Sequence, residues 1–335
     1  MSVRVGIVSF AHVHAPPYAE VLVSLDSADF VGISDDDASR GREAAERYGV
    51  SFFESAQALF DAVEAVIVCS ENKNHARDVI AALRSGVHVL CEKPIATTIE
   101  DAQAMIRTSK EAERQFRIAF PVRYLPSVRH AREIVRSGEI GRILGANATN
   151  HGQIPGGWFV DPDLAGGGAV MDHTVHVADA LRWMFGAEAT SVYAEVGTFF
   201  GGGEIDDGAI LTVEFEGGIL PESAFVSIDP SWSRGEGYPT WGDVTLRVTG
   251  TSGVVNVDAF ARPLTIFEHE EGKTLWAPTG EDMNVLMLKD FLGGVASGSP
   301  GGASGEDGLR VLEIVLGAYR SGQDHEPIEV ELTEV

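Results

Sequence analysis

The sequence reads Val87-His88-Val89-Leu90-Cys91-Glu92-Lys93-Pro94 at the end of a short apolar run. The first five residues predict a buried β-strand. Pro94 cannot donate to a sheet ladder and holds Lys93 in an extended turn. Ligands of α/β sheets bind at the carboxyl ends of the strands, so Lys93 is a candidate functional residue, although most lysines are solvated surface charges.

Strands alternate with helices along the first third of the chain. We expect strands at residues 3–8, 30–34, 65–69, 87–91 and 116–120, and helices at 17–25, 38–48, 75–84 and 99–113. Such alternation predicts an α/β fold with a parallel sheet.

The pattern changes after Pro121. We expect helices at residues 128–136, 169–185 and 309–320 and strands at 143–150, 191–198, 209–215, 224–228, 243–249 and 254–258. The Gly/Ser-rich segment 293–308 reads as a surface loop. A chain of 335 residues fits two domains, and the second is predicted to be α+β with an antiparallel or mixed sheet.

The composition narrows the class of partner. The net charge is −25, which repels nucleic acid and anionic membrane surfaces. No apolar stretch reaches the roughly 18 residues of a membrane span, and the amino terminus lacks the layout of a signal peptide. We therefore expect a cytoplasmic protein without nucleic-acid or membrane partners, in which Cys69 and Cys91 are reduced and buried.

The acidic composition also suggests a hypothesis about the source. The chain has 50 Asp and Glu residues and only 25 Lys and Arg residues. An acidic surface is typical of proteins adapted to concentrated salt, where screening removes much of the self-repulsion. We hypothesise a halophilic source, and a melting temperature that did not rise with added KCl would count against it.

The turn after the first strand departs from a known cofactor motif. A dinucleotide fold places the glycines of G-x-G-x-x-G here, so that backbone amides can approach a pyrophosphate. This chain has Ser9, Ala11 and His14 at the three glycine positions. Ala11 is small and the Ser9 hydroxyl can donate, so the turn stays a candidate. Asp35, roughly 20 residues downstream of the turn, could accept the ribose hydroxyls of NAD and repel the extra phosphate of NADP, although a charged loop fits equally well.

A second group of candidates lies on the helix expected over residues 169–185. Asp172 and His176 are four residues apart and project from one face, with His173 about 100° away. The preceding Gly166-Gly167-Gly168 lets a ligand or another backbone approach the helix start. A carboxylate beside an imidazole can position a hydroxyl group and take its proton. The helix alone favours the simpler interpretation, an ordinary salt bridge or a core histidine.

The number of histidines near these motifs also raises the alternative of a metal site. Oxygen and nitrogen ligands could come from Asp172, His173 and His176 together with His12, His14, His75 or His151. However, two histidines three residues apart form no zinc signature, and neither H-E-x-x-H nor a cysteine pair is present. We therefore expect no metal.

Taken together, these motifs resemble the Gfo/Idh/MocA family of NAD(P)-dependent oxidoreductases over nearly the whole chain. They are the first turn, the Asp35 run, Glu92-Lys93-Pro94, and the glycine run followed by Asp172 and His176. Further matches are Ser70-Glu71-Asn72-Lys73-Asn74-His75, similar to the family's T-P-N-x-x-H with Glu71 in place of proline, Arg123 with Pro126, and Ser137-Gly138-Glu139-Ile140-Gly141. The missing glycines are the departure from the pattern.

The resemblance implies a Rossmann domain with a doubly wound parallel sheet over residues 1–121. It implies an α+β domain over residues 122–335, whose large open, mostly antiparallel sheet supports a homodimer or homotetramer. The implied cofactor is NAD, with NADP less favoured, and the implied substrates are sugars, cyclitols or related polyols. The implied cofactor-binding residues are Ser9, Phe10, Ala11, His12, Asp35, Ser70, Asn72, His75, Glu92 and Lys93.

By the same resemblance, Lys93, Asp172 and His176 form the catalytic group of a dehydrogenase or reductase acting on CH–OH groups. His176 would accept the substrate hydroxyl proton, Lys93 would stabilise alkoxide character, and Asp172 would hold substrate and charged groups in place. Candidate substrate-lining residues are Arg123, His151, Trp158 and His173, a mixture of donors and an aromatic face that suits polyols.

Two other functions stay open on the sequence. The missing glycines would suit a regulator that binds a dinucleotide without turnover, although a regulator has no need of a proton relay. The histidine-rich turn and helix would suit a metal-dependent lyase or hydrolase. Elemental analysis showing purified protein free of metal would dispose of that function.

Overall fold

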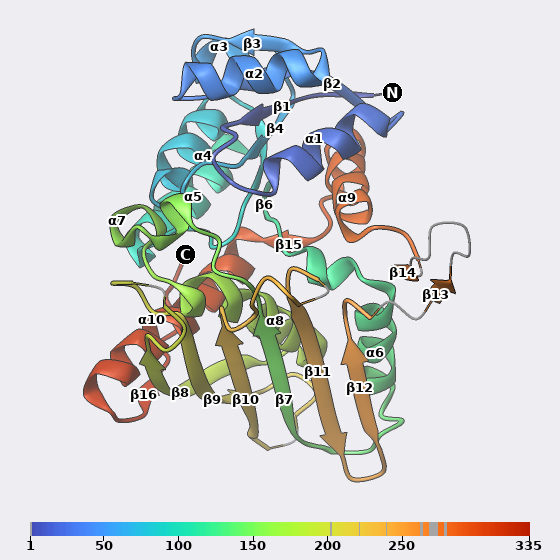
Figure 1. Ribbon diagram of the computed structural model, residues 1–335, viewed down its shortest axis with the longest axis vertical. Coiled ribbons are helices and arrows are strands. Elements are labelled where there is room, and N and C mark those ends of the chain that lie inside the picture. Colours follow the sequence, from blue (N-terminus) through green and yellow to red (C-terminus); the bar gives the residue numbers. More distant parts are fainter. Residues whose placement is uncertain are drawn as a thin grey trace.

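Two seven-stranded sheets lie one above the other along the long axis of the molecule (Figure 1). They are seen in a computed structural model that describes residues 2–335 apart from 202, 221, 239, 262–263, 268–273 and 278–279. The strand orders are β15-β6-β5-β4-β1-β2-β3 and β12-β11-β7-β10-β9-β8-β16. The predicted α/β class, with a parallel sheet followed by a mostly antiparallel one, is confirmed.

The first sheet is parallel from β1 to β6. Its strands are β1 (Val3–Val8), β2 (Ala28–Ser34), β3 (Ser51–Phe53), β4 (Ala65–Val68), β5 (His88–Cys91) and β6 (Phe116–Ile118). The helices between them are α1 (Ala15–Ser24), α2 (Ala38–Tyr48), α3 (Ala56–Phe60), α4 (His75–Arg84) and α5 (Ile99–Ala112). The apolar strands are buried on both faces because helices cover both.

The strand order reverses beside β1, which lies between β2 and β4. In open α/β sheets such a reversal leaves a crevice at the carboxyl ends of the strands, where ligands bind. The turn after β1, the Ser70 segment after β4 and Glu92-Lys93-Pro94 after β5 all lie at this edge. The topology therefore brings three segments of the predicted site together.

Helices cover one face of the second sheet (Figure 1). Its strands are β7 (Ile143–His151), β8 (Glu188–Gly197), β9 (Gly208–Glu216), β10 (Ala224–Ser231), β11 (Asp243–Gly250), β12 (Val254–Asp258) and β16 (Ile328–Glu329). The covering helices are α6 (Pro126–Ser137), α8 (Ala169–Phe185) and α10 (Gly305–Asp324). Shorter elements are η1 (Asn72–Asn74), η2 (Pro121–Tyr124), η3 (Gly157–Val160), α7 (Pro162–Ala165) and a hairpin of β13 (Leu264–Phe267) and β14 (Thr274–Ala277). Only the β7–β10 pair is parallel among the described strands of this sheet.

The chain returns to the first sheet near its end. Helix α9 (Met283–Ser297) packs apolar side chains into the core formed with α1, and β15 (Ala303–Ser304) pairs with β6. The surface loop predicted over residues 293–308 is limited to residues 298–302, between α9 and β15. Gly305 serves packing, since a Cβ there would lie 2.7 Å from the ring of Phe116. Residues 283–304 thus join the first sheet, although the predicted division at residue 121 places them in the second domain.

The glycine run before α8 lets backbone segments meet. A Cβ at Gly168 would lie 1.8 Å from the carbonyl oxygen of Asp206. The Asp206 carboxylate accepts hydrogen bonds from the amides of Gly168 and Val170, at 2.8 and 2.9 Å, and so satisfies the start of α8. The sequence predicted that these glycines let either a ligand or another backbone approach the helix start, and the structure shows the approach of another backbone.

A buried ion pair joins η2, which follows β6, to the helices of the second sheet. The guanidinium of Arg123 makes two hydrogen bonds of 2.6 Å with the carboxylate of Asp179 in α8, and lies 3.1 Å from Asp307 in α10. Because buried charges are tolerated only when paired, this contact fixes η2 against both helices.

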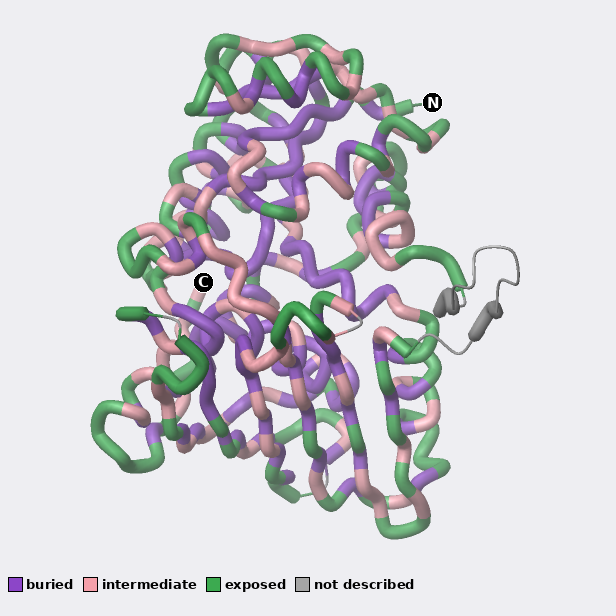
Figure 2. The backbone as a smooth tube through the Cα atoms, in the orientation of Figure 1, coloured by how far each residue is buried: buried purple, intermediate pink, exposed green. Residues whose placement is uncertain are grey.

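The other face of the second sheet carries no helix among the described residues (Figure 1). Figure 2 shows buried and exposed residues alternating along these strands. The exposed set includes Ile210 and Phe225. None of the described helices is long and apolar enough to span a membrane.

A charged cluster lies where β7 and β10 end and β11 begins. The two ring nitrogens of His151 lie 2.9 Å from Asp243 and 3.2 Å from Asp229, and Arg234 also pairs with Asp243. Burial alone would lower the pKa of His151, but hydrogen bonds to the two carboxylates outweigh it and raise the pKa to about 9. The charged imidazole therefore holds these strand ends together.

This cluster makes stability depend on pH. The folded-state pKa of His151 lies above the ordinary value of about 6.5, so its contribution is complete below pH 6.5 and is lost towards pH 9. We expect the free energy of unfolding in urea to fall over this interval, and to fall less in His151→Gln. Equal slopes in the two proteins would contradict the role given to His151.

Candidate active site

An ion pair between the two domains forms the centre of the site. The ammonium of Lys93, after β5, contacts the Asp172 carboxylate in the first turn of α8, and its Nζ lies 3.3 Å from the Asp172 carbonyl oxygen. Lys93 is 3% exposed, and its peptide bond to Pro94 is cis. Burial alone would raise the pKa of Asp172, but Lys93 and His173 hold it well below its usual range. The Asp172 carboxylate is therefore ionised.

Other contacts fix the orientation of the Asp172 carboxylate. Its Oδ2 accepts a hydrogen bond of 3.2 Å from the indole of Trp232 and lies 3.2 Å from Nε2 of His173. Nδ1 of His173 lies 3.0 and 3.1 Å from the carbonyl oxygens of Asn150 and Ser231. Since carbonyl oxygens only accept, Nδ1 donates to them, and the imidazole is anchored to β7 and β10.

His176 lies one helical turn beyond Asp172 and lines the same cavity. Its Nδ1 is buried without a hydrogen-bond partner in the described part of the chain. Burial, reinforced by the charge of Lys93, holds the pKa of His176 well below its ordinary value. The imidazole is therefore neutral near pH 7 and can accept a proton.

Glu92 is a buried anion beside this group, with no exposed surface. It accepts hydrogen bonds from Nδ1 of His14 at 3.0 Å, from the hydroxyl of Tyr18, and from the Lys93 amide at 3.1 Å. Burial alone would raise the pKa of Glu92, but His12, His14 and Lys93 together hold it well below its usual range. Hydrogen bonds from several directions thus stabilise the carboxylate.

The turn after β1 keeps a glycine-like backbone without the glycines. Ser9 has φ of 68°, in the left-handed region where a side chain is strained, and its Oγ accepts the Ala11 amide at 3.1 Å. The amide of His12 donates to the carbonyl of Cys69, and that of His14 donates to Nδ1 of His12. Several amides that a fingerprint turn would offer to a pyrophosphate are therefore used within the chain.

Asp35 completes this turn. Its carboxylate accepts hydrogen bonds from the amides of Phe10 and Asp37, at 2.7 and 2.8 Å, and from the guanidinium of Arg40 at 2.7 and 2.9 Å. The Asp35 side chain has no exposed surface. Its oxygens are thus occupied by protein donors, whereas the sequence predicted them to accept ribose hydroxyls.

Three other predicted cofactor-binding residues, Ser70, Asn72 and His75, belong to the segment that follows β4. Both ring nitrogens of His75 face carbonyl oxygens, of Pro94 at 2.9 Å and of Ser70 at 3.1 Å. The side-chain amide of Asn72 donates to the backbone carbonyl of Ala165 at 2.8 Å, and this hydrogen bond links η1 to α7. Oγ of Ser70 and Oδ1 of Asn72 are buried without hydrogen-bond partners among the described residues.

A cavity of about 110 Å³ brings the predicted catalytic residues together. Its lining includes His12, His14, Lys93, Asp172, His173 and His176. Lining residues that the sequence analysis missed include Asn150, Phe159, Trp241, Phe260 and Met283. An outer groove of about 880 Å³ shares Val13, His14, Trp241, Phe260 and Met283 with it. No motif marked these residues, because they come from separate elements that include β7, η3 and the start of α9.

Three of the four predicted substrate-lining residues do not line this cavity. The guanidinium of Arg123 is paired with the buried carboxylate of Asp179. His151 belongs to the charged cluster at the strand ends. Trp158 stacks on Phe159 with ring centroids 3.9 Å apart, and its indole donates to the carbonyl of Ala11 at 2.9 Å. Of the four predicted residues, only His173 is among the residues that line the cavity.

The protonation of the His12 ring nitrogens indicates whether His12, His14 and Glu92 are arranged to bind a metal ion. Side-chain atoms of His12, His14 and Glu92 lie within 4.8 Å of one another. Because Nδ1 of His12 accepts the His14 amide, a neutral ring carries its proton on Nε2, which lies 3.8 Å from Glu92. A histidine that ligates a metal normally donates from its other ring nitrogen, and His12 has the reverse arrangement. This geometry favours a hydrogen-bonded network over a metal centre.

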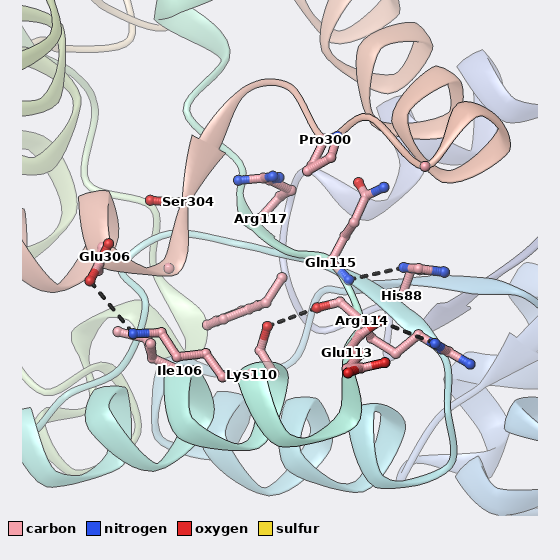
Figure 3. Close-up of a pocket in the computed structure, with 14 residues that line it drawn as sticks. His88, Ile106, Lys110, Glu113, Arg114, Gln115, Arg117, Pro300, Ser304 and Glu306 are labelled. Atoms are coloured by element: carbon pink, nitrogen blue, oxygen red, sulfur yellow. Dashed lines mark hydrogen bonds and ion pairs between the residues drawn. The ribbon is translucent and has the colours of Figure 1, made fainter. Parts of the chain in front are cut away.

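A separate cavity of about 390 Å³ lies at the edge of the first sheet, where β15 joins β6 (Figure 3). Lys110 of α5 and Glu306 of α10 approach across it, with 3.8 Å between Nζ and Oε1. None of the predicted catalytic, cofactor-binding or substrate-lining residues lines this cavity.

Comparisons with known proteins agree with this architecture. Residues 3–120 match the model described as "Oxidoreductase family, NAD-binding Rossmann fold", and residues 128–256 match "GFO/IDH/MocA C-terminal domain". The chain is 28% identical to myo-inositol 2-dehydrogenase of Thermotoga maritima, covering 98% of each chain. It is 30% identical to D-glucoside 3-dehydrogenase of Escherichia coli, covering 65% of this chain and 68% of that protein.

A solved structure extends the agreement to three dimensions. The probable dehydrogenase from Thermotoga maritima superposes with a TM-score of 0.82 at 26% identity, over 98% of this chain and 99% of that one. The resemblance inferred from the sequence motifs is thereby confirmed, and so is NAD as the cofactor class. The chain belongs to the Gfo/Idh/MocA family of oxidoreductases, with an NAD-binding Rossmann domain at its amino-terminal end.

Proposed function

We propose that the protein is an NAD-dependent dehydrogenase or reductase of sugars, cyclitols or related polyols. The main support for this proposal is the Lys93–Asp172 ion pair, which lies beside a neutral His176 in a cavity at the carboxyl edge of the parallel sheet. The names of the relatives support the substrate class, since they include dehydrogenases of myo-inositol and of D-glucosides.

The three side chains divide the proton chemistry among them. When bound, NAD supplies the nicotinamide carbon that exchanges hydride with the substrate carbon. In oxidation, His176 takes the hydroxyl proton, and the Lys93 ammonium stabilises the developing alkoxide. Asp172 holds Lys93 in place, and His173 and Trp232 orient its carboxylate in turn. Reduction of a carbonyl reverses each role.

The regulator considered from the sequence receives less support than the enzyme. Its motivation was the loss of the glycines, and the amides of the turn are indeed largely used within the chain. A protein without turnover has no requirement for a buried lysine, a carboxylate and an imidazole around one cavity, the last with no partner for its Nδ1 among the described residues. That convergence favours catalysis.

Two finer proposals concern the surroundings of the enzyme. Cys69 and Cys91 are free and buried, which fits a reducing cytoplasm. The net charge of −25 supports a halophilic source for the physical reason given above. The KCl dependence of the melting temperature tests the second of these proposals.

A direct activity screen tests the function. Sugars and cyclitols are incubated with the protein and NAD or NADP, at low and high KCl, while reduced nicotinamide is followed by its absorbance. We expect turnover of at least one polyol, with NAD preferred. Absence of turnover across the set, with NAD bound, would favour the regulator.

Replacement of the central side chains tests the mechanism. Lys93→Met and His176→Gln should each lower turnover by roughly 100-fold or more, as loss of an acid–base group does, while NAD binding measured by calorimetry survives. Lys110→Met and His130→Gln, at exposed sites, are matched controls that should keep full activity. Full activity in either central variant would remove that residue from the mechanism.

The uncovered face of the second sheet supports a homodimer or homotetramer. Ile210 and Phe225 expose 54% and 59% of their surface on this face, and such apolar exposure is typical of an interface. We expect light scattering to give a dimer or tetramer, and Phe225→Asp to shift it towards monomer. A monomer at every concentration would contradict the proposal.

A further inference from the structure

His14 is held by a carboxylate in the geometry of a proton-transfer dyad. Its Nδ1 lies 3.0 Å from Oε1 of Glu92, and an ionised carboxylate only accepts, so Nδ1 carries the proton. In the neutral ring, Nε2 is therefore left as a free base. An imidazole oriented in this way by a third group is the usual arrangement of a general base.

The residue has no other evident duty in the described part of the chain. His14 precedes α1 as its N-cap but makes no side-chain hydrogen bond to the helix. It occupies a fingerprint glycine position, where a helix start normally needs no side chain. Glu92, its partner, is fully buried and holds the His14 ring through Nδ1.

The position of His14 connects the inner cavity to the outside. It lines both the cavity around Lys93, Asp172 and His176 and the larger outer groove. Its side chain is 35% exposed, whereas Glu92 behind it is not exposed at all. His14 therefore stands between the reacting groups and solvent.

Oxidation creates a need for such a group. Bound NAD would take up the hydride, with its two electrons, from the carbinol carbon, and the hydroxyl would lose one proton in each turnover. Burial and the charge of Lys93 lower the pKa of His176, so a proton does not rest there. It must pass to water before the next cycle.

We propose that His14, positioned by Glu92, is a second proton-transfer group that carries the substrate proton between His176 and solvent. The inference rests on the proposed function. The proton leaves His176, reaches Nε2 of His14 through water in the cavity, and departs from the same nitrogen into the outer groove. No electrons move in this transfer, and reduction runs it backwards.

Several charged and titratable groups surround the dyad. They are His12 in the same turn, Tyr18 on α1, Glu92 and Lys93 after β5, and Asp172 and His176 on α8. Burial and Glu92 raise the pKa of Tyr18 well above its ordinary value, so Tyr18 stays protonated and donates to Glu92. Of the two histidines of the turn, only His14 is appreciably exposed.

Chemical rescue distinguishes proton transfer from a structural role. In dilute buffer, His14→Gln should lower turnover by about 10-fold or more, and added imidazole should restore it to within about threefold of the unmodified protein. The unmodified protein should not respond to imidazole. His130→Gln, which removes an exposed histidine paired with Glu133, is the matched control and should behave as the unmodified protein.

A second variant examines the partner. Glu92→Gln keeps an acceptor for Nδ1 but removes the charge, so it should also lower turnover and respond to imidazole.

NAD affinity and melting temperature of His14→Gln should match those of the unmodified protein. Unchanged turnover in His14→Gln, or a loss that imidazole does not restore, would overturn the inference alone. Absence of turnover by the unmodified protein would remove the proposed function together with it.

Discussion

The buried ion pair between Lys93 and Asp172 constrains the rest of the structure. Each charge is costly to bury alone, so the end of β5 and the first turn of α8 must stay in contact. The turn after β5 rests on Glu92 and His75, and α8 rests on Asp206, Trp232 and the Arg123–Asp179 pair. Much of the buried polar network therefore serves to hold two side chains from different domains at one point.

The glycine-free turn shows how a backbone conformation can be kept by other means. A glycine adopts positive φ without cost, whereas Ser9 does so under strain of roughly 1–3 kcal/mol. The strain is offset by hydrogen bonds from the turn to Ser9 Oγ, Asp35 and the Cys69 carbonyl. The Asp35 carboxylate supports this turn through the amides of Phe10 and Asp37. The third fingerprint position carries His14, which brings a titratable group to the edge of the cavity.

Local patterns were sufficient to predict much of the fold. The periodicity of α4 and α8 gave their bounds correctly, and the spacing of Asp172 and His176 placed both at one cavity. Contacts between distant residues could not be inferred this way: Arg123 and Asp179 are 56 positions apart, and His14 and Glu92 are 78 apart. Helix α9 was missed because glycines interrupt its pattern and its apolar side chains are explained only by α1, which they contact.

The return of the chain to the first sheet has a consequence for synthesis. The sheet that begins at Val3 gains its last edge strand only when residue 304 has been made, after every strand of the second sheet except β16. Until then β6 has an open edge, and the side of α1 that receives α9 exposes apolar surface. Neither domain is a contiguous piece of chain. A ribosome-bound fragment that ended before α9 would carry both sheets but only an incomplete first core.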